Sequence, residues 1–488
     1  MYGDSITMTA TAAAPPSPEP DADPPGHPWR WLILGIVLVA EIMDLLDSTI
    51  ITIAAPVIRG DLGAGESAMQ WWAAGYTLAF GVLLIVGGRL GDVFGRRRMF
   101  LLGMAGFTLA SAACALAPSS GVLIATRAVQ GAFGALLIPQ GLGIIKQVFP
   151  PKQLGAAFAA FGPVMGLAAI GGPILGGWLA GADLLGTGWR MVFLINLPVG
   201  IAGLLLALRF VPESKSPNAI RLDWLGVLLI GAASLALIYP LVQGREAGWP
   251  AWTFALLALG VVLLGLFAKV ERSGRGTPLI EPSLLRNRAF RGGLLFGIVF
   301  FAGFTGMMLV FSVFLQVGLG FSPEHTGLTF APMSLGAAIG AGGSYPLMAK
   351  FGRRVLHSGL VVGVAALTAL ALIIGAQGAD TTSWQLAGPL LAYGIGMGLV
   401  FGPFFNVVLA GVDEHEVGSA SGTLTAVQQL GGSAGIAVLA TLFFSIVDDG
   451  TASPDAARTT MLVAAGLLAV SALVAFLLPR EARMEEVH

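Results

Sequence analysis

The first long apolar stretch of the chain reads WLILGIVLVAEIMDLLDSTIITIAAPVI over residues 31–58. It is long enough to cross a bilayer as a helix, because a span needs about 20 apolar residues. Three carboxylates, Glu41, Asp44 and Asp47, interrupt it at spacings that place them on one helix face. Each costs about 2.5 to 3.5 kcal/mol at the bilayer centre, and a protonated acid costs far less. The stretch therefore predicts a membrane helix whose acidic face is a proton or ligand site.

The composition of the whole chain predicts a polytopic membrane protein. Of the 488 residues, 56% are hydrophobic, 11% are charged and 69 are glycines, which allow close approach of membrane helices. The net charge of -1 argues against a nucleic-acid partner. Cys114 is the single cysteine and the five histidines are not spaced to share a metal, so we expect no disulfide, no metal and no cofactor. No catalytic constellation is visible, which argues against an enzyme.

Fourteen apolar segments follow a Pro-, Ala- and Asp-rich tail, residues 1–29, for which we predict disorder. An even number of spans puts both termini on one side, and the positive-inside rule makes that side cytoplasmic. All of the 26 lysines and arginines are expected on the cytoplasmic side except five. Arg59, Arg190, Arg245 and Arg458 lie in predicted outer loops, and Arg127 lies within a span. The segments are expected at approximately 31–56, 69–92, 98–117, 120–148, 153–181, 189–211, 222–243, 250–270, 290–317, 323–349, 355–376, 384–410, 418–446 and 458–479.

An internal repeat predicts how these segments are grouped. Gly95-Arg96-Arg97 and Gly352-Arg353-Arg354 lie 257 residues apart, and Gly171-Gly172 and Gly431-Gly432 lie 260 apart. Two halves that rock about a midplane site are how many secondary transporters alternate access. The predicted divisions are an N-terminal six-helix bundle over 30–211, two inserted helices with a cytoplasmic linker over 212–289, a C-terminal six-helix bundle over 290–480 and a cytoplasmic tail over 481–488.

The loop after the second segment reads GRLGDVFGRRR over residues 88–98. Glycine permits a tight turn, and the basic cluster anchors the loop at the cytoplasmic face. The loop resembles the signature between helices 2 and 3 of the major facilitator superfamily. Asp92 can pair with a nearby arginine or with the amino end of the helix over 418–446, which would hold the two halves together on the inner side. The positions that carry this conformational motif are Gly88, Asp92, Gly95, Arg96 and Arg97.

Two further stretches resemble motifs of the same superfamily. Residues 127–131, RAVQG, are similar to the motif whose buried arginine is tied to proton transfer. Residues 166–177, GLAAIGGPILGG, resemble the motif associated with antiporters. Small residues at this density permit close helix packing, and a proline can bend the helix. The positions concerned are Gly171, Gly172, Pro173, Gly176 and Gly177.

Residues 46–56 and 189–198 resemble the branch of fourteen-helix drug:proton antiporters. That branch usually has Asn where Thr52 stands, so this chain has a hydroxyl there in place of a side-chain amide. The resemblance covers roughly residues 31–480. It implies an all-α polytopic membrane protein with the superfamily fold, namely two six-helix bundles plus two inserted helices.

Arg127 needs a counter-ion within the membrane, and the acids of the first helix are the available ones. The alternative is that Arg127 lies near the outer interface and reaches toward water. We rank Asp47 first as proton carrier because it occupies the motif position, and Asp44 second. Glu41 lies nearer the inner end and would serve proton exit, or act as a structural hydrogen-bonding acid.

The predicted function is proton-coupled antiport in the plasma membrane, by a monomer that exports hydrophobic or amphipathic drug-like or antibiotic molecules. The proton gradient would drive it. No other predicted span has a carboxylate well inside it, so a cationic substrate would share these acids with protons. Export of an endogenous metabolite or peptide and proton-coupled import remain as alternatives. Expected substrate contacts are Tyr76, Phe80, Phe301, Met307, Phe405, Asn406, Gln428 and Gln429.

Overall fold

The computed structural model describes residues 26–150, 153–154, 156–157, 161–215, 223–273, 279–409, 412 and 416–479. Over these residues the regular structure is helical, with no strand. Most of the tail predicted over 1–29, and all of the tail predicted over 481–488, lie outside the described residues. The prediction of an all-α chain is confirmed.

Each of the fourteen predicted segments is helical over most of its described residues, and the exceptions lie mainly at the segment ends. The N-terminal group comprises α1 (Arg30–Leu62), α2 (Glu66–Phe94), α3 (Arg96–Ala115), α4 (Ser120–Val148), α6 (Phe161–Gly181), α7 (Met191–Leu194) and α8 (Asn196–Phe210). The middle group comprises α9 (Trp224–Gln243), α10 (Ala251–Ser273) and the short α11 (Pro282–Arg286). The C-terminal group comprises α12 (Arg288–Val313), α13 (Pro323–Phe351), α14 (Arg354–Gln377), α15 (Ser383–Leu409), α16 (Val417–Asp448) and α17 (Ser453–Val474).

Many of these helices suit a membrane. Among the described residues, 10 helices are long and apolar enough to cross a bilayer, or 11 if the bent α2 counts as one span. The chain is therefore a multi-pass membrane protein. Helices α1, α6 and α13 are outside this set; α1 is as long as its neighbours but carries the three acids. Whether these three helices also cross the membrane stays a prediction, and so does the total of fourteen spans.

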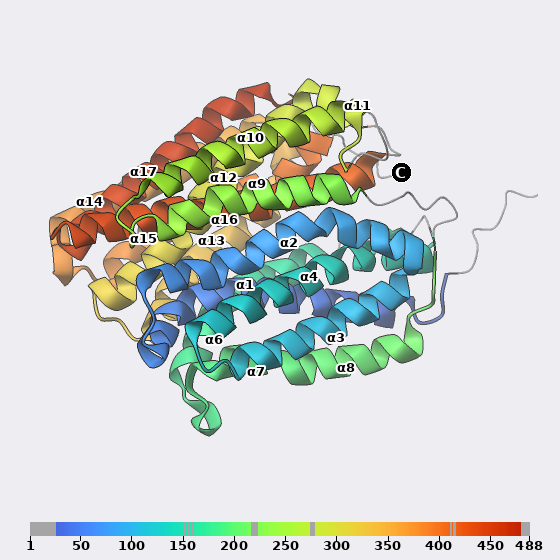
Figure 1. Ribbon diagram of the computed structural model, residues 1–488, viewed down its shortest axis with the longest axis horizontal. Coiled ribbons are helices and arrows are strands. Elements are labelled where there is room, and N and C mark those ends of the chain that lie inside the picture. Colours follow the sequence, from blue (N-terminus) through green and yellow to red (C-terminus); the bar gives the residue numbers. More distant parts are fainter. Residues whose placement is uncertain are drawn as a thin grey trace, which may run out of the picture.

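The helices pack as two bundles that face each other (Figure 1). Within the first bundle α4 packs on α2 and α3, and α1 packs on α6 and α8; within the second, α15 packs on α13 and α14, and α12 on α16. Two seams join the bundles, one between α2 and α16 and the other between α6 and α13. The hairpin of α9 and α10 lies against α2 and α16. This grouping follows the predicted repeat, while the residue boundaries of the divisions stay predictions.

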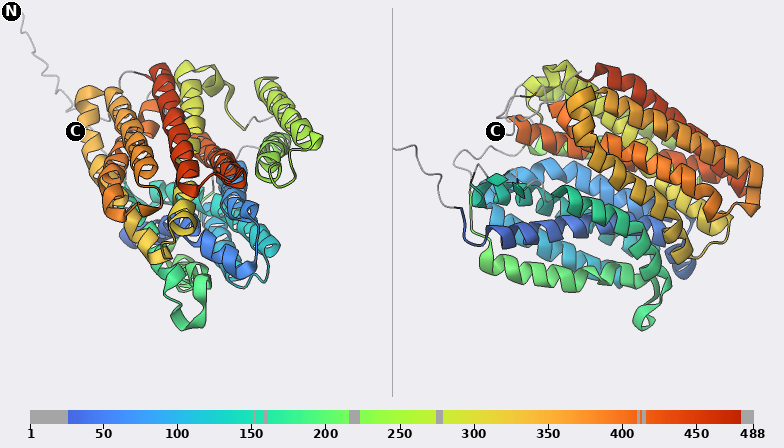
Figure 2. Two further views of the ribbon diagram at one scale, coloured as in Figure 1. Left: turned by 90° about the vertical axis from the view of Figure 1, so that its left-hand side faces the viewer. Right: turned by 180° about the vertical axis from the view of Figure 1, so that it is seen from behind.

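Both ends of the described chain lie at one end of the molecule, which we call the inner end (Figure 2). Polar contacts between the bundles occur at mid-height and toward the opposite, outer end. There Gln316 donates to the carbonyl of Ile53 over 2.8 Å, and Thr441 donates to the amide oxygen of Gln70 over 3.3 Å. The two bundles draw apart toward the inner end (Figures 1 and 2). We call this arrangement inward-open.

Candidate functional site

Asp47 of α1 and Arg127 of α4 form an ion pair in the middle of the first bundle. Their residues are 3% and 0% exposed. Arg127 therefore does not reach toward water, and the interfacial alternative considered for it is wrong. Its Nε also donates to the carbonyl oxygen of Trp72 over 3.0 Å, and its Nη1 to Oε1 of Gln130 over 2.6 Å. The counter-ion expected for this arginine is present.

Neutral donors complete the shell around the Asp47 carboxylate. Nε2 of Gln130 donates to its Oδ1 over 2.8 Å, and Nδ2 of Asn196, on α8, donates to the same atom over 3.1 Å. Both amides also lie within hydrogen-bond reach of the Ser111 hydroxyl, at 2.8 and 3.3 Å. A buried carboxylate is tolerated only when a countercharge and hydrogen bonds replace its lost water. The arrangement supplies both, so the charge on Asp47 is compensated in this conformation.

Asp44 is placed differently from Asp47, one helical turn away. It is half-buried, and the hydroxyl of Tyr76 donates to its Oδ1. The ring of Tyr76 lies under the Arg127 guanidinium, with 4.3 Å between the cation and the ring centroid. Tyr76 therefore touches both the acid and the arginine. A change of charge at Asp44 would be transmitted directly to the ion pair.

Glycines on α4 face the acids of α1, and Gly134 leaves room for Asp44. A Cβ atom on Gly134 would lie 3.2 Å from Oδ1 of Asp44, and one on Gly141 would lie 3.8 Å from Oε1 of Glu41. Arg127, Gly134 and Gly141 are spaced seven residues apart and so share one face of α4. The acids of α1 follow this face from the buried ion pair toward the inner end, with Glu41, half-buried, the innermost.

The loop motif is a rigid turn between α2 and α3. Gly95 has φ 107°, a backbone conformation that favours glycine, and a Cβ there would lie 2.5 Å from Glu213. A Cβ on Gly91 would lie 1.7 Å from the amide oxygen of Gln140 on α4, whereas Gly88 has more space, with Pro139 3.6 Å away. The glycines at 91 and 95 are thus required by close approach and by the turn.

Arg96 and Arg97 hold the loop to its own bundle, while Arg89 donates to the carbonyl of Leu279 in the linker over 3.2 Å. Arg96 donates to Asp92 over 2.9 and 3.2 Å, and Arg97 donates to the carbonyl of Leu208 near the end of α8. Of the two partners considered for Asp92, the nearby arginine is the one present. Among the described residues, no hydrogen bond or ion pair joins Asp92 to the amino end of α16, which begins at Val417.

The glycine-rich motif of α6 lies between the two bundles. Cβ atoms on Gly172 and Gly176 would lie 2.4 Å from Thr49 and 3.1 Å from Ile50 of α1. A Cβ on Gly177 would lie 2.4 Å from the carbonyl oxygen of Pro323, at the start of α13. On the same side, the carbonyl of Pro173 is 2.5 Å from a Cβ built on Gly327. Gly171 faces open space. The motif therefore packs α6 closely against both α1 and α13.

The residues expected to contact substrate fall into two groups. Buried side chains that join the packing are Tyr76, Phe80, Phe301 and Met307. Half-buried side chains are Phe405, Asn406, Gln428 and Gln429. The structure thus brings Tyr76 into the acid and arginine cluster, and the substrate role of the whole set stays a prediction.

Three members of the cluster were not predicted as site residues: Gln130, Asn196 and Ser111. Gln130 follows Arg127 by three residues and shares its helix face, so the motif itself pointed to it. Asn196 is an amide within an otherwise apolar segment, which is a signal for a buried polar contact. Ser111 lies in a Gly- and Ala-rich helix and carries no such signal.

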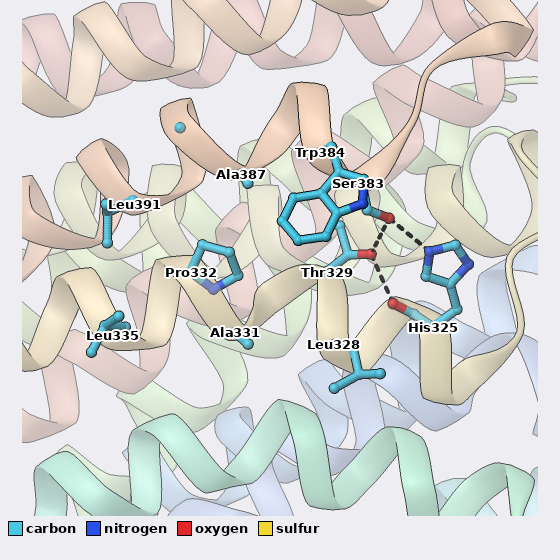
Figure 3. Close-up of a pocket in the computed structure, with 11 residues that line it drawn as sticks. His325, Leu328, Thr329, Ala331, Pro332, Leu335, Ser383, Trp384, Ala387 and Leu391 are labelled. Carbon is cyan, nitrogen blue, oxygen red and sulfur yellow. Dashed lines mark hydrogen bonds between the residues drawn. The ribbon is translucent and has the colours of Figure 1, made fainter.

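A separate apolar groove lies at the outer end of α13 and α15, away from the acids (Figure 3). Its polar end is formed by Ser383, whose hydroxyl lies 2.8 Å from both Nε2 of His325 and the hydroxyl of Thr329. The remaining wall is almost wholly apolar and includes Pro332 and Trp384. None of the residues predicted for coupling or substrate contact lines it.

Comparison with known proteins places this geometry in a family context. The model of the Major Facilitator Superfamily matches residues 37–436. The chain is 51% identical to the protein named "Probable actinorhodin transporter" of Streptomyces coelicolor, over 91% of this chain and 78% of that protein. It is 36% identical to the puromycin resistance protein pur8 of Streptomyces alboniger, over 92% of each chain. It is 33% identical to the tetracenomycin C resistance and export protein of Streptomyces glaucescens, over 87% and 77%.

Solved structures are similar in fold. A bacterial homologue of the human lysosomal transporter Spinster, in an inward-facing and occupied conformation, superimposes with a TM-score of 0.65 at 19% identity, covering 92% of this chain and 97% of that one. A POT family transporter in complex with 5-aminolevulinic acid gives a TM-score of 0.67 at 15% identity, covering 90% of this chain and 94% of that one. The arrangement of two facing bundles is thus one that known transporters adopt.

Proposed function

The chain belongs to the Major Facilitator Superfamily, and from that premise we propose that it is a proton-coupled antiporter that exports antibiotic or drug-like molecules across the plasma membrane. Both termini would lie in the cytoplasm, as the distribution of lysines and arginines indicates. The observation that carries the proposal is the acidic face of α1, with one acid compensated by Arg127 and one linked to it through Tyr76.

The two acids have different roles in this proposal. Asp47 keeps its charge in the inward-open state, because a guanidinium and two amides surround it. Asp44 has fewer partners and is half-buried, so it exchanges its proton or meets a cationic group of the substrate first. This moves Asp44 ahead of Asp47 as the site of exchange, and leaves Asp47 as the residue that holds Arg127. Glu41 leads protons toward the inner end.

The exchange couples to movement through Arg127. When Asp44 is protonated, only the Asp47 carboxylate remains to balance the positive charge of Arg127. The Tyr76 hydroxyl then loses its charged hydrogen-bond acceptor. The ligand that binds one conformation better shifts the populations of the two. Proton and substrate therefore favour opposite states when both compete for one acid, and outward substrate movement is driven by inward proton movement.

The substrate class follows from the relatives rather than from the site. Two of the relatives are named for resistance or export, one for puromycin and the other for tetracenomycin C. The apolar surroundings of the acids suit a hydrophobic or amphipathic molecule. A second candidate, export of an endogenous metabolite, is favoured by the relative named as an actinorhodin transporter.

Resistance profiling in a host that lacks its own efflux pumps tests the proposal. Cells that make the protein are compared with cells that make the Asp44→Asn variant at equal membrane levels, with puromycin and tetracenomycin C among the compounds. We expect the parent to raise the inhibitory concentration of one or more compounds severalfold and the variant to raise none. Equal sensitivity of all cultures to every compound would argue against drug export and favour the second candidate.

A further inference from the structure

The inserted hairpin of α9 and α10 lies across the seam between α2 of the first bundle and α16 of the second (Figure 1). At its outer end, the hydroxyl of Thr441 on α16 donates to the carbonyl of Leu241 on α9 over 2.8 Å. The same hydroxyl reaches Gln70 on α2 over 3.3 Å. The hairpin is thus in contact with both bundles where they meet.

Arg245, in the loop after α9, binds a carboxylate of each bundle. Its Nη2 lies 2.8 Å from Oε2 of Glu66, in the first turn of α2, and its Nη1 pairs with Asp448, the last residue of α16. The guanidinium also lies over the ring of Phe444, 5.2 Å from its centroid. The Arg245 side chain is only 9% exposed. One cation from the hairpin therefore joins the outer ends of the two bundles.

Neighbouring contacts fix this loop to the first bundle. Oε1 of Glu246 accepts a hydrogen bond from the backbone N–H of Ser67 over 3.0 Å. Glu66 is also 3.5 Å from Arg59 of α1. Because the loop is held to α2 at more than one point, a relative movement of the bundles would break its contacts with α16, of which the pair with Asp448 is the ionic one.

We propose that Arg245 is a positioning residue of the transport cycle, which clasps the outer ends of the two bundles in the inward-open state and must release Asp448 before the outer side opens. Rocking of one bundle against the other would separate the end of α16 from the start of α2. Arg245 cannot stay in contact with both helix ends when they separate. The inserted helices thereby gain a function in the cycle, one that depends on alternating access and not on proton coupling.

The size of the effect follows from the exposure of the partners. Asp448 is 54% exposed at its side chain, so water and salt screen its pair with Arg245. Loss of the clasp is expected to change the ratio of outward-open to inward-open molecules by about two- to fivefold, the effect that a screened ion pair can have. High salt should weaken the clasp of the parent protein and leave a variant without it unchanged.

Spin-label distance measurement on the full chain in lipid tests the clasp. Labels are attached at Ser119→Cys and Ala379→Cys, both exposed and in outer loops of different bundles, in a Cys114→Ser background. Arg245→Gln should increase the population with the longer distance between the labels. Arg190→Gln is the matched control, since Arg190 is also an outer arginine but pairs with Asp61 inside the first bundle, at 3.2 Å.

Two outcomes overturn the proposal: an unchanged distance distribution in Arg245→Gln, or an equal shift in Arg190→Gln. If Arg245→Gln fails to fold, Asp448→Asn replaces it, because this residue is exposed and its loss leaves the rest of the cluster paired. It is expected to shift the distribution in the same direction by a smaller factor. An unchanged distribution in Asp448→Asn, with normal helicity, contradicts the clasp as well.

Discussion

The two bundles share a plan but differ at their centres. The 257-residue offset of the repeated loops aligns Asp44 and Asp47 of α1 with Phe301 and Phe304 of α12. Phe304 lies 5.0 Å from the ring of Phe401 and stacks on Tyr393 at 6.4 Å. The corresponding helix faces thus carry acids in one bundle and aromatic rings in the other. Under the proposed function, the first bundle would handle charge and the second would supply apolar surface.

The repeated loops, in contrast, share a glycine with positive φ and an arginine that binds a backbone carbonyl. Gly95 and Gly352 both have positive φ, of 107° and 53°. The arginines beside them bind backbone carbonyls near the end of the last helix of their own bundle, Arg97 that of Leu208 and Arg353 that of Phe476. What the halves share is therefore the anchoring of a tight inner turn, and what separates them is the chemistry at mid-height.

The largest expected effect comes from removing the charge of the first bundle. Asp47→Asn leaves the buried Arg127 without its counter-ion, which costs about 3 to 5 kcal/mol of stability. We expect loss of transport and a lower melting temperature, measured by vesicle uptake and by thermal unfolding in detergent.

The double variant Asp47→Asn, Arg127→Gln shows whether transport is lost because the protein is less stable or because the coupling acid is missing. It removes both charges, so stability should largely return while coupled transport stays absent. Coupled transport at the parental rate in the double variant would contradict the assignment of charge handling to this pair.

The next effect concerns the seam that lets the bundles meet. Gly177→Ala places a methyl group 2.4 Å from the carbonyl of Pro323, so α6 and α13 must move apart. Overpacking of this kind costs about 1 to 3 kcal/mol, and we expect about a tenfold lower transport rate. Gly171→Ala is the control, because nothing lies within 4 Å of its Cβ. Equal rates in the two variants would show that close packing at this seam is unimportant.

Much of this arrangement was predictable from sequence, for physical reasons that differ by residue. Acids in an apolar membrane stretch are energetically costly, so Asp44 and Asp47 predicted a functional site there. A buried arginine needs a negative partner, so Arg127 predicted an ion pair with one of these acids. The partners of Arg245 were not predictable. Glu66 and Asp448 lie at helix ends, where charged residues are common, and they come near Arg245 only because the bundles pack together. The partner of Asp92 depends on which conformation the chain adopts, which sequence patterns do not specify.

A smaller effect is expected in the second bundle. Phe304→Leu removes aromatic contacts with Phe300, Tyr393 and Phe401, each worth about 0.5 to 1.5 kcal/mol beyond area burial. The KM for an aromatic substrate should rise by about two- to fivefold with proton coupling intact. Uncoupled transport in this variant would break the division of roles between the bundles.

The smallest effect is expected at the inner loop. Asp92→Asn weakens a half-exposed pair with Arg96, and such pairs contribute about 0.2 to 1 kcal/mol. The transport rate of the variant should be about twofold lower than that of the parent, at a normal expression level. A complete loss of transport would indicate that Asp92 makes a stronger contact in another state, such as the one predicted with α16.

Proton movement measured during transport tests the central claim most directly. Everted vesicles from a host without its own pumps are made acidic inside, and a pH-sensitive dye reports their interior when an exported compound is added. Protons should leave the vesicles as the compound enters, and Asp44→Asn should show neither movement. Accumulation of the compound with no proton flux, and at the same rate after a protonophore has collapsed the gradient, would contradict proton-coupled export through the acids of α1.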